Sequence, residues 1–315
     1  MPPLVSVIVP NWNGERHLPA CLDSLCRQTY DHREVIVVDN ASSDGSVALM
    51  ERGYPQVKIV RLPVNRGFAG GANEGIRAAQ GEVIALLNND AEADPNWLAE
   101  LVAALSQHPE AGMAASKMLL YDRRDVINSA GDFYGPDGVP GNRGVWQRDS
   151  GQYQREEWVF GPCGGAAAYR RTLLDQIGLL DEAFFFSVED VDLAWRAQLA
   201  GYRCIYVPRA VVYHKLSATG GGPTASYYCG RNFIYVLAKD VPGSLLRKHW
   251  PAMVRAQLRF VWESLRHFRE AAARARLRGQ LIGLLHVPKL LKARREVQAS
   301  KRVSDEYLET ILSRG

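Results

Sequence analysis

The first third of the chain alternates short apolar runs with helical stretches, and this rhythm restricts the possible folds more than any other feature. Four runs rich in β-branched residues cover positions 5–9, 35–38, 57–62 and 83–87. Segments with the apolar spacing of helices lie at residues 16–26, 73–79 and 95–107. Such an alternation of strands and helices predicts an α/β fold, with a parallel sheet and helices on both of its faces.

Polar residues follow each of the four runs at the point where the run ends. They include Asn11, Asp39, Arg66 and Asp90. In open α/β sheets, ligands bind outside the C-terminal ends of the strands. Any one cluster is equally well explained as a turn, because Asn and Asp are common turn formers. Four clusters in succession favour a shared ligand-binding crevice.

The alternation weakens after residue 113. Residues 131–144 are rich in Gly and Pro, which favours a long loop or an edge hairpin. Cys163 and Gly164 belong to a run of small residues, where a ligand or another backbone segment can approach closely. Further on, we expect a helix at 172–180, strands at 203–207 and 210–214, and mostly helices from residue 226.

The cysteines and the N-terminus bear on the cellular compartment. Five cysteines, an odd number without a CxxC pair, predict free thiols in a reducing compartment rather than disulfides or a zinc site. The N-terminus lacks the basic and apolar regions of a secretory signal, and no run of about 18 apolar residues occurs. We therefore expect a cytoplasmic protein without a transmembrane helix.

Two common nucleotide-binding motifs are absent after the first predicted strand. Neither GxGxxG nor the Walker sequence occurs there, which disfavours a dehydrogenase and an NTPase. Instead, several glycines separate Arg66 from Asn73, in front of an expected helix. Such glycines let the helix amides face a diphosphate, and Arg66 adds positive charge. A tight loop without a ligand is the alternative interpretation.

Acidic residues at two strand ends are candidates for ligand binding. Asp39 can accept hydrogen bonds from a base or a ribose, or it can form a turn that leads into a helix. Asp90 follows Asn88 and Asn89. A carboxylate flanked by amides suits Mg²⁺ or Mn²⁺ that is held jointly by protein and phosphate oxygens.

A second acidic group, at residues 189–192, follows Ser187, the expected N-cap of a helix. Acids in a first turn stabilise a helix by about 0.3–1 kcal/mol each, which explains Glu189 and Asp190 without any function. The alternative is a base that takes a proton from an acceptor hydroxyl. His214, after an expected strand, is either structural or part of a metal shell.

Together these motifs resemble the family 2 glycosyltransferases with the GT-A fold, in particular the rhamnosyltransferase-like branch that extends cell-surface polysaccharides. The resemblance runs from about residue 5 to residue 239. Its markers are Pro-Asn-Trp-Asn at 10–13, Asp-Asn-Ala-Ser-Ser-Asp-Gly at 39–45, Gly-Phe-Ala-Gly-Gly-Ala-Asn at 67–73, Asn-Asn-Asp at 88–90, Glu-Asp-Val-Asp at 189–192 and His214. It implies a Rossmann-like mixed sheet with helices on both faces.

The resemblance also implies roles for individual residues. The donor, a nucleotide diphosphate sugar, would be bound by residues at the strand ends: Pro10, Asn11, Asn13, Asp39, Arg66, Asn73, Asn88 and Asn89. Asp90 and His214 would hold Mg²⁺ or Mn²⁺ at the donor diphosphate, and Asp190 would be the catalytic base. We assign acceptor binding to three residues beside it: Glu189, Cys163 and Gly164.

The implied reaction is an inverting, metal-dependent transfer of a sugar to a hydroxyl of a cell-surface polysaccharide or a lipid-linked glycan, with dTDP-rhamnose as the favoured donor. Asn88 replaces the first Asp of the family's Asp-x-Asp signature, and Ala72 replaces an Arg found in many relatives. The uncharged Asn88 leaves open a catalytically inactive nucleotide-binding or scaffold protein. The Gln-x-x-Arg-Trp motif of processive synthases is absent, so we expect one sugar per encounter.

The C-terminal region differs in charge from the rest of the chain. Residues 243–302 hold 15 Lys or Arg against 3 Glu, whereas the remainder holds 23 basic and 31 acidic residues. We therefore divide the chain into a GT-A domain, 1–242, and a basic amphipathic helical extension, 243–315. Apolar residues at helical spacing predict packing on the first domain, packing in a homodimer, or peripheral binding to the anionic inner face of the plasma membrane. No nucleic-acid-binding module is recognisable, so we expect no nucleic acid partner.

Overall fold

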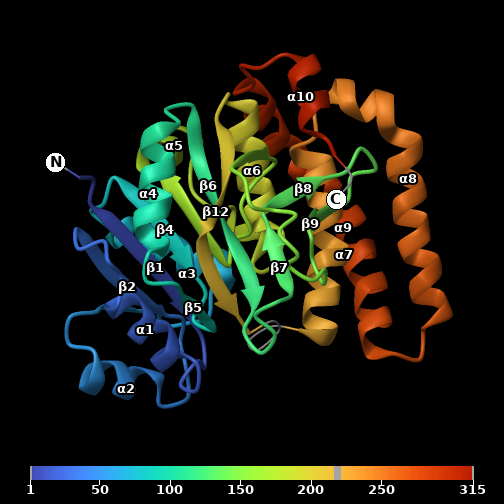
Figure 1. Ribbon diagram of the computed structural model, residues 1–315. Coiled ribbons are helices and arrows are strands. Elements are labelled where there is room, and N and C mark those ends of the chain that lie inside the picture. Colours follow the sequence, from blue (N-terminus) through green and yellow to red (C-terminus); the bar gives the residue numbers. More distant parts are fainter. Residues whose placement is uncertain (1, 216–220, 314–315) are drawn as a thin grey trace.

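A mixed β-sheet with helices on both faces forms the centre of the molecule (Figure 1). The computed structural model describes residues 2–215 and 221–313. The strands in these residues are β1 (Val5–Asn11), β2 (Arg33–Asp39), β3 (Lys58–Arg61), β4 (Val83–Leu87), β5 (Ala91–Ala93), β6 (Ala111–Leu120), β7 (Ile127–Ala130), β8 (Asp132–Tyr134), β9 (Pro140–Asn142), β10 (Glu157–Val159), β11 (Ala166–Arg170) and β12 (Arg203–His214).

Helices alternate with these strands and then dominate the C-terminal third. Those in the described residues are α1 (Leu18–Cys26), α2 (Ser46–Gly53), α3 (Gly67–Ala78), α4 (Trp97–Gln107), α5 (Arg171–Ile177), the 3-10 helix η1 (Glu182–Phe184), α6 (Glu189–Leu199), α7 (Gly222–Lys239), α8 (Gly243–Arg266), α9 (Ala271–Ala299) and α10 (Asp305–Ile311).

The N-terminal half of the sheet is parallel, as the alternation of strands and helices predicts. The sheet order is β10-β12-β6-β11-β4-β1-β2-β3, and β1 pairs in parallel with both β2 and β4. Alternate residues of β1 face two different cores, with Val7 on one side and Ile8 on the other. The register places Asn11 opposite Asp39, so the polar residues that end these strands meet at one edge.

The other half of the sheet is mixed, as the resemblance implied. β11 runs antiparallel to its neighbours β4 and β6, and β12 is parallel to β6. All ten residues of β6 are buried. The strand pattern in the sequence is weak here, because a strand that is buried on both faces does not alternate apolar and polar residues.

The glycine-rich segment before Asn73 is helical, and the expectation of a loop there was wrong. Helix α3 begins at Gly67 and includes the glycines. A Cβ atom on Gly71, in this segment, would lie 3.3 Å from Asn40 Nδ2 and 3.6 Å from Pro10 Cβ, and one on Gly75, one turn further along, would lie 2.2 Å from the Ile8 side chain. The missing side chains therefore let α3 pack closely on β1 and β2, and this close approach outweighs the low helix propensity of glycine.

Three local expectations need comment. Residues 203–214 form one strand rather than two, with a register shift between Val207 and Val211. The hairpin expected in residues 131–144 is confirmed as β8 and β9. Ser187 does not cap α6, because the N-cap is Val188 in a left-handed conformation.

The C-terminal helices continue the hydrophobic core of the sheet. Helix α9 packs along α7, and Leu290, Val297 and Leu308 share one core with the sheet residue Ile8. In Figure 1, α8 forms the outer edge of this layer. Within the described residues, no helix combines the length and the apolar character that spanning a membrane requires.

Candidate active site

A pocket of about 580 Å³ opens where β1 and β4 end. One wall consists of residues from the strand ends and the segments after them: Pro10, Asn11, Asn40, Asn88 and Asn89. The opposite wall comes from the turn before α6 and the start of α7, with Phe185, Phe186, Thr224 and Tyr228. The pocket thus lies at the edge of the sheet where the positions of the polar residues predicted a ligand.

Buried amides join three of the strand ends beside this pocket. Asn89 Nδ2 donates a 2.7 Å hydrogen bond to Asn11 Oδ1, and Asn11 Nδ2 donates at 3.3 Å to Asp39 Oδ1. All three side chains are at most 4% exposed. A hydrogen-bonded network of buried polar groups has few alternative arrangements, so it holds this wall of the pocket in one geometry.

Asn13 and Asn40 shape the loops around the same wall. Asn13 has a left-handed φ of 51°, and its Oδ1 accepts a 2.8 Å hydrogen bond from the Ser43 amide. Asn40 Nδ2 donates to the Gly67 carbonyl at 2.8 Å. Asn40 directly follows Asp39, the last residue of β2, so its position in the sequence already marks it as a candidate for this wall.

Two predicted donor-binding residues are engaged with protein groups instead. The Arg66 guanidinium forms 2.6 Å ion pairs with Glu74 and Glu182. Asn73 is buried, and its Nδ2 donates to the Leu180 carbonyl at 2.8 Å. In the structure these side chains tie α3 to the segment before α6, which is a structural role, and neither is among the residues that line the pocket.

Asp90 and His214 lie together as a pair of potential metal ligands. Strand β5 pairs with β12 in a register that places Ala91 opposite His214, and Asp90 Oδ1 lies 3.2 Å from His214 Nε2. His214 Nδ1 lies 2.9 Å from Asn128 Oδ1. Because an amide oxygen only accepts, Nδ1–H donates this hydrogen bond, and Nε2 is left as the ligand atom, the arrangement usual for metal-binding histidines. A carboxylate and an imidazole nitrogen fit Mn²⁺ or Mg²⁺ at a diphosphate.

Asn88 connects this pair to the pocket and to the segment at 163–165. Its Nδ2 lies 3.3 Å from His214 Nε2, and its backbone amide donates to the Gly165 carbonyl at 2.9 Å. Asn88 also lines the pocket. Asn88, which replaces the first Asp of the Asp-x-Asp signature, therefore contacts the pocket, His214 and the segment at 163–165.

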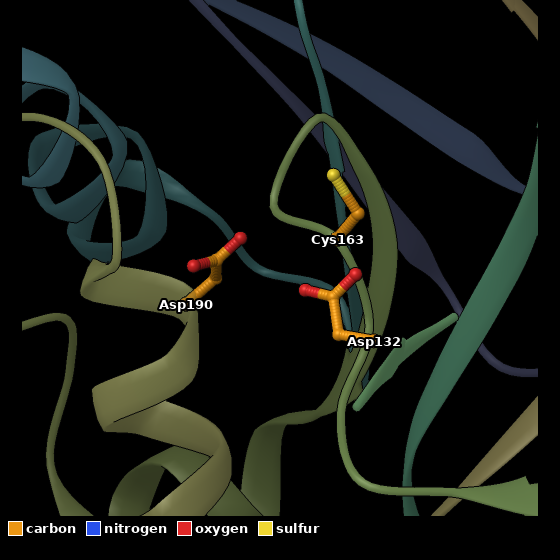
Figure 2. Close-up of side chains that lie close together, drawn as sticks. All are labelled: Asp132, Cys163 and Asp190. Carbon is orange, nitrogen blue, oxygen red and sulfur yellow. The ribbon is translucent and has the colours of Figure 1, made fainter. Parts of the chain in front are cut away.

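Asp190 lies in the first turn of α6, with its carboxylate directed at the small-residue segment. Asp190 Oδ2 accepts a 2.8 Å hydrogen bond from the Gly164 amide, and Oδ1 accepts one of 2.8 Å from its neighbour Val191. Figure 2 shows the carboxylate facing Cys163 and Asp132, and potential ligand atoms of the three residues lie within 4.8 Å of one another. A side chain at position 164 would crowd the carboxylate, since a Cβ would lie 3.2 Å from Oδ2.

No sequence motif indicates that Asp132 or the aromatic wall of the pocket belongs to the site. Asp132 opens a short strand inside the glycine-rich region and is only 6% exposed. Phe185 and Phe186 directly precede Ser187 in the chain, and nothing in the sequence distinguishes them from core aromatics. Tyr228 comes from α7, more than 40 residues along the chain, and only the packing of α7 brings it to the pocket.

Burial raises the pKa of three neighbouring carboxyl groups, those of Asp190, Asp132 and Glu189. Burial and the Asp190 charge raise the pKa of Asp132 well above its usual range, and the same two causes raise the pKa of Glu189 to about 8. Asp190 is the group of the three whose ionisation raises the pKa of the other two, so it is the carboxylate best able to be charged at neutral pH.

We predict that replacing Glu189 with Gln stabilises the fold at high pH only. The raised pKa of Glu189 means that the wild-type fold loses stability as pH rises from about 4.5 to about 8, whereas glutamine does not titrate. The variant should match the wild type near pH 4.5 and exceed it by about 2–4 kcal/mol at pH 8.5, measured by chemical denaturation.

The matched control is Glu270→Gln, because the Glu270 side chain is 65% exposed. Its stability difference from the wild type should stay within about 0.5 kcal/mol at both pH values. Equal stability of Glu189→Gln and wild type at pH 8.5 would mean that Glu189 is not a buried, perturbed acid.

Comparison with known proteins gives consistent results. The family model described as glycosyl transferase family 2 matches residues 6–178. An N-acetylglucosaminyl-diphospho-decaprenol L-rhamnosyltransferase of Mycobacterium tuberculosis is 28% identical over 300 residues, which cover 82% of this chain and 95% of that protein. The O-antigen biosynthesis protein RfbC of Myxococcus xanthus is 30% identical over 240 residues, 72% of this chain. The chain spans a quarter or less of the length of two of the curated relatives it matches.

A solved structure shares the fold. The mannosyltransferase PcManGT of Pyrobaculum calidifontis, in complex with GDP-Man and Mn²⁺, superposes with a TM-score of 0.57 and 18% identity, over 99% of this chain and 84% of that one. At this level of identity the likeness concerns the fold alone.

Proposed function

The chain belongs to glycosyl transferase family 2, and from that premise we propose that it is an inverting, non-processive enzyme that moves a sugar from a nucleotide diphosphate to an acceptor hydroxyl. One observation supports this most directly. Asn88 joins the amide-lined pocket, the Asp90–His214 pair and the segment that holds Asp190. A donor site, a metal site and a base are the three parts that such a reaction needs.

The proposed chemistry follows from the groups present. Asp190 accepts the proton of the acceptor hydroxyl as that oxygen attacks the anomeric carbon, and direct displacement inverts this centre. Hydrogen bonds from Gly164 and Val191 orient the carboxylate, while burial raises its pKa and makes it a better base than an exposed aspartate. The amide network at Asn11, Asp39 and Asn89 would hold the nucleotide.

We propose Asp90 and His214 as the ligands of a divalent metal ion, Mg²⁺ or Mn²⁺. Bound there, the ion would neutralise negative charge on the leaving diphosphate. Asn128 fixes the ring of His214, and the structurally similar mannosyltransferase was solved with Mn²⁺.

The donor and the acceptor are proposed from the relatives. The mycobacterial relative is named as an L-rhamnosyltransferase that acts on N-acetylglucosaminyl-diphospho-decaprenol, and RfbC is named for O-antigen biosynthesis. We propose rhamnose from dTDP-rhamnose as the donor sugar. The acceptor would be a lipid-linked glycan or a cell-surface polysaccharide that Glu189, Cys163 and Gly164 contact beside the base.

We predict that Asp190→Asn abolishes transfer but keeps donor binding. Loss of the base should lower turnover by about 10²–10⁴-fold. The dissociation constant of the nucleotide diphosphate sugar with Mn²⁺, measured by calorimetry, should change less than about threefold, because Asp190 is not among the residues that line the pocket.

The paired variant is Asp90→Asn, which should weaken the Mn²⁺-dependent part of donor binding. Turnover near the wild-type level in Asp190→Asn would refute the base. A wild-type protein that binds the donor but transfers to no acceptor would favour an inactive nucleotide-binding protein.

A surface on α8 and α9 supports a second proposal, contact with an anionic membrane. Large apolar side chains on it are roughly half exposed or more: Trp250, Val254, Leu258, Trp262, Leu265, Phe268, Leu281, Leu284, Leu285 and Leu291. Exposed basic residues flank them, including Arg255, Arg259, Lys289 and Lys292. An apolar face bordered by cations matches anionic lipid headgroups above acyl chains, so we propose that this surface binds peripherally to the inner face of the plasma membrane.

We predict that wild-type protein co-sediments with vesicles containing phosphatidylglycerol and much less with pure phosphatidylcholine. Trp262→Glu and Leu285→Glu should abolish sedimentation, whereas Trp146→Glu, an exposed tryptophan far from this surface in the sequence, should not. If these two variants instead dissociate a homodimer in analytical ultracentrifugation and leave vesicle binding unchanged, the surface is a subunit interface.

A further inference from the structure

The turn that precedes Asp190 has an unfavourable backbone conformation. Phe185, Ser187 and Val188 have φ values of 63°, 67° and 74°. Residues other than glycine rarely occupy this left-handed region, and a β-branched residue such as valine is the rarest there. Such a conformation persists only where surrounding groups hold it.

Asn232 on α7 holds this turn. The side chain is 0% exposed, and Nδ2 donates to the carbonyls of Phe184 and Phe186 at 3.1 Å and of Ser187 at 2.6 Å. Three carbonyl groups of the turn therefore converge on one amide nitrogen. The Phe185 carbonyl of the same turn accepts a 3.4 Å hydrogen bond from the Ala69 amide of α3.

Arg231, the preceding residue, fixes the orientation of that amide. Arg231 Nε donates to Asn232 Oδ1 at 2.8 Å, so the oxygen is turned away from the turn and the NH₂ group faces it. Arg231 Nη2 also donates to the carbonyls of Ala183 and Phe184, both at 2.7 Å. Two consecutive residues of α7 thus bind the carbonyls of Ala183, Phe184, Phe186 and Ser187.

The turn links two parts of the site. On its N-terminal side, Phe185 and Phe186 line the pocket, and Phe185 stacks on Tyr228 with ring centroids 5.3 Å apart. On its C-terminal side, Val188 begins α6, and Asp190 follows two residues later. The path of the turn therefore determines where the carboxylate lies relative to the pocket.

Helix α9 supports α7 at the same level. A Cβ on Gly283 would lie 3.0 Å from the Arg231 carbonyl, and one on Gly279 would lie 2.1 Å from that of Tyr227. These glycines let the two helices touch through their backbones. The C-terminal helices thus hold the segment of α7 that carries Asn232.

We infer that Asn232 is a positioning residue for the reaction, which acts by fixing the turn at residues 184–188 and, through it, the Asp190 carboxylate. This inference rests on the proposed function of Asp190 as the base. It gives the C-terminal helices a part in the geometry of the active site.

The test compares Asn232→Leu, which has similar size but no donor, with Asn232→Ser, which is smaller and keeps one donor. The matched control is Tyr235→Phe, which removes a hydrogen bond between α7 and His286 of α9 and keeps the aromatic ring that packs on Phe184. Misplacement of a catalytic group by about 1 Å costs about 100-fold in rate. In Asn232→Leu, kcat should fall about 100-fold. The donor KM should change by a smaller factor, because only Phe185 and Phe186 of the turn line the pocket, and the hydrogen bond between Asn89 and Asn11 on the other wall is intact.

Hydrogen exchange of the amides of residues 185–191 is the second readout and needs no substrate. It should accelerate at least about tenfold in Asn232→Leu, less in Asn232→Ser, and not in Tyr235→Phe. Folded Asn232 variants with wild-type kcat or with unchanged exchange would overturn the inference. If the wild type proves inactive while exchange still accelerates in Asn232→Leu, the hold on the turn stands and the proposed function has failed.

Discussion

The hydrogen bond from Asn89 to Asn11 joins the ends of β4 and β1, and the rest of the site depends on the arrangement that makes it possible. Parallel pairing brings the C-terminal ends of β1, β2 and β4 to one edge, so that Asn11, Asp39 and Asn89 meet there. The two side-chain amides and the Asp39 carboxylate are buried and hydrogen-bond to one another. One wall of the pocket is therefore rigid before a ligand arrives, which lowers the ordering cost of binding.

The opposite wall is held by different means. It consists of a strained turn and the start of α7, and buried polar groups keep α7 in place. Lys239 near the end of α7 forms 2.5 Å ion pairs with Asp192 of α6 and with Asp181. Asp192 is fully buried and is shared between Lys239 of α7 and Arg196 of α6, so these buried charges couple the two helices. Asp190, the proposed base, and the aromatic wall thus belong to one structural unit.

Much of the fold could be predicted from the sequence, and the failures have physical causes. The strands of the first third were found because short apolar runs end in polar clusters. The helical glycines before Asn73 were misassigned because helix propensity says nothing about how closely Gly71 approaches Asn40 and Pro10. At the site, Asp90, His214 and Asp190 were singled out by local motifs, and these assignments stay predictions. Asp132 and Asn232 could not be found, because only tertiary packing brings them to Asp190.

The central claim is that the pocket, the Asp90–His214 pair and Asp190 form one active site. A crystal structure with a nucleotide diphosphate and Mn²⁺ tests it most directly, with the ion located by anomalous scattering. We expect an anomalous peak within coordination distance of the Asp90 carboxylate and His214 Nε2. The nucleotide should lie against Asn11 and Asp39. A peak at Asp132, Cys163 and Asp190, or a nucleotide bound elsewhere, would contradict it.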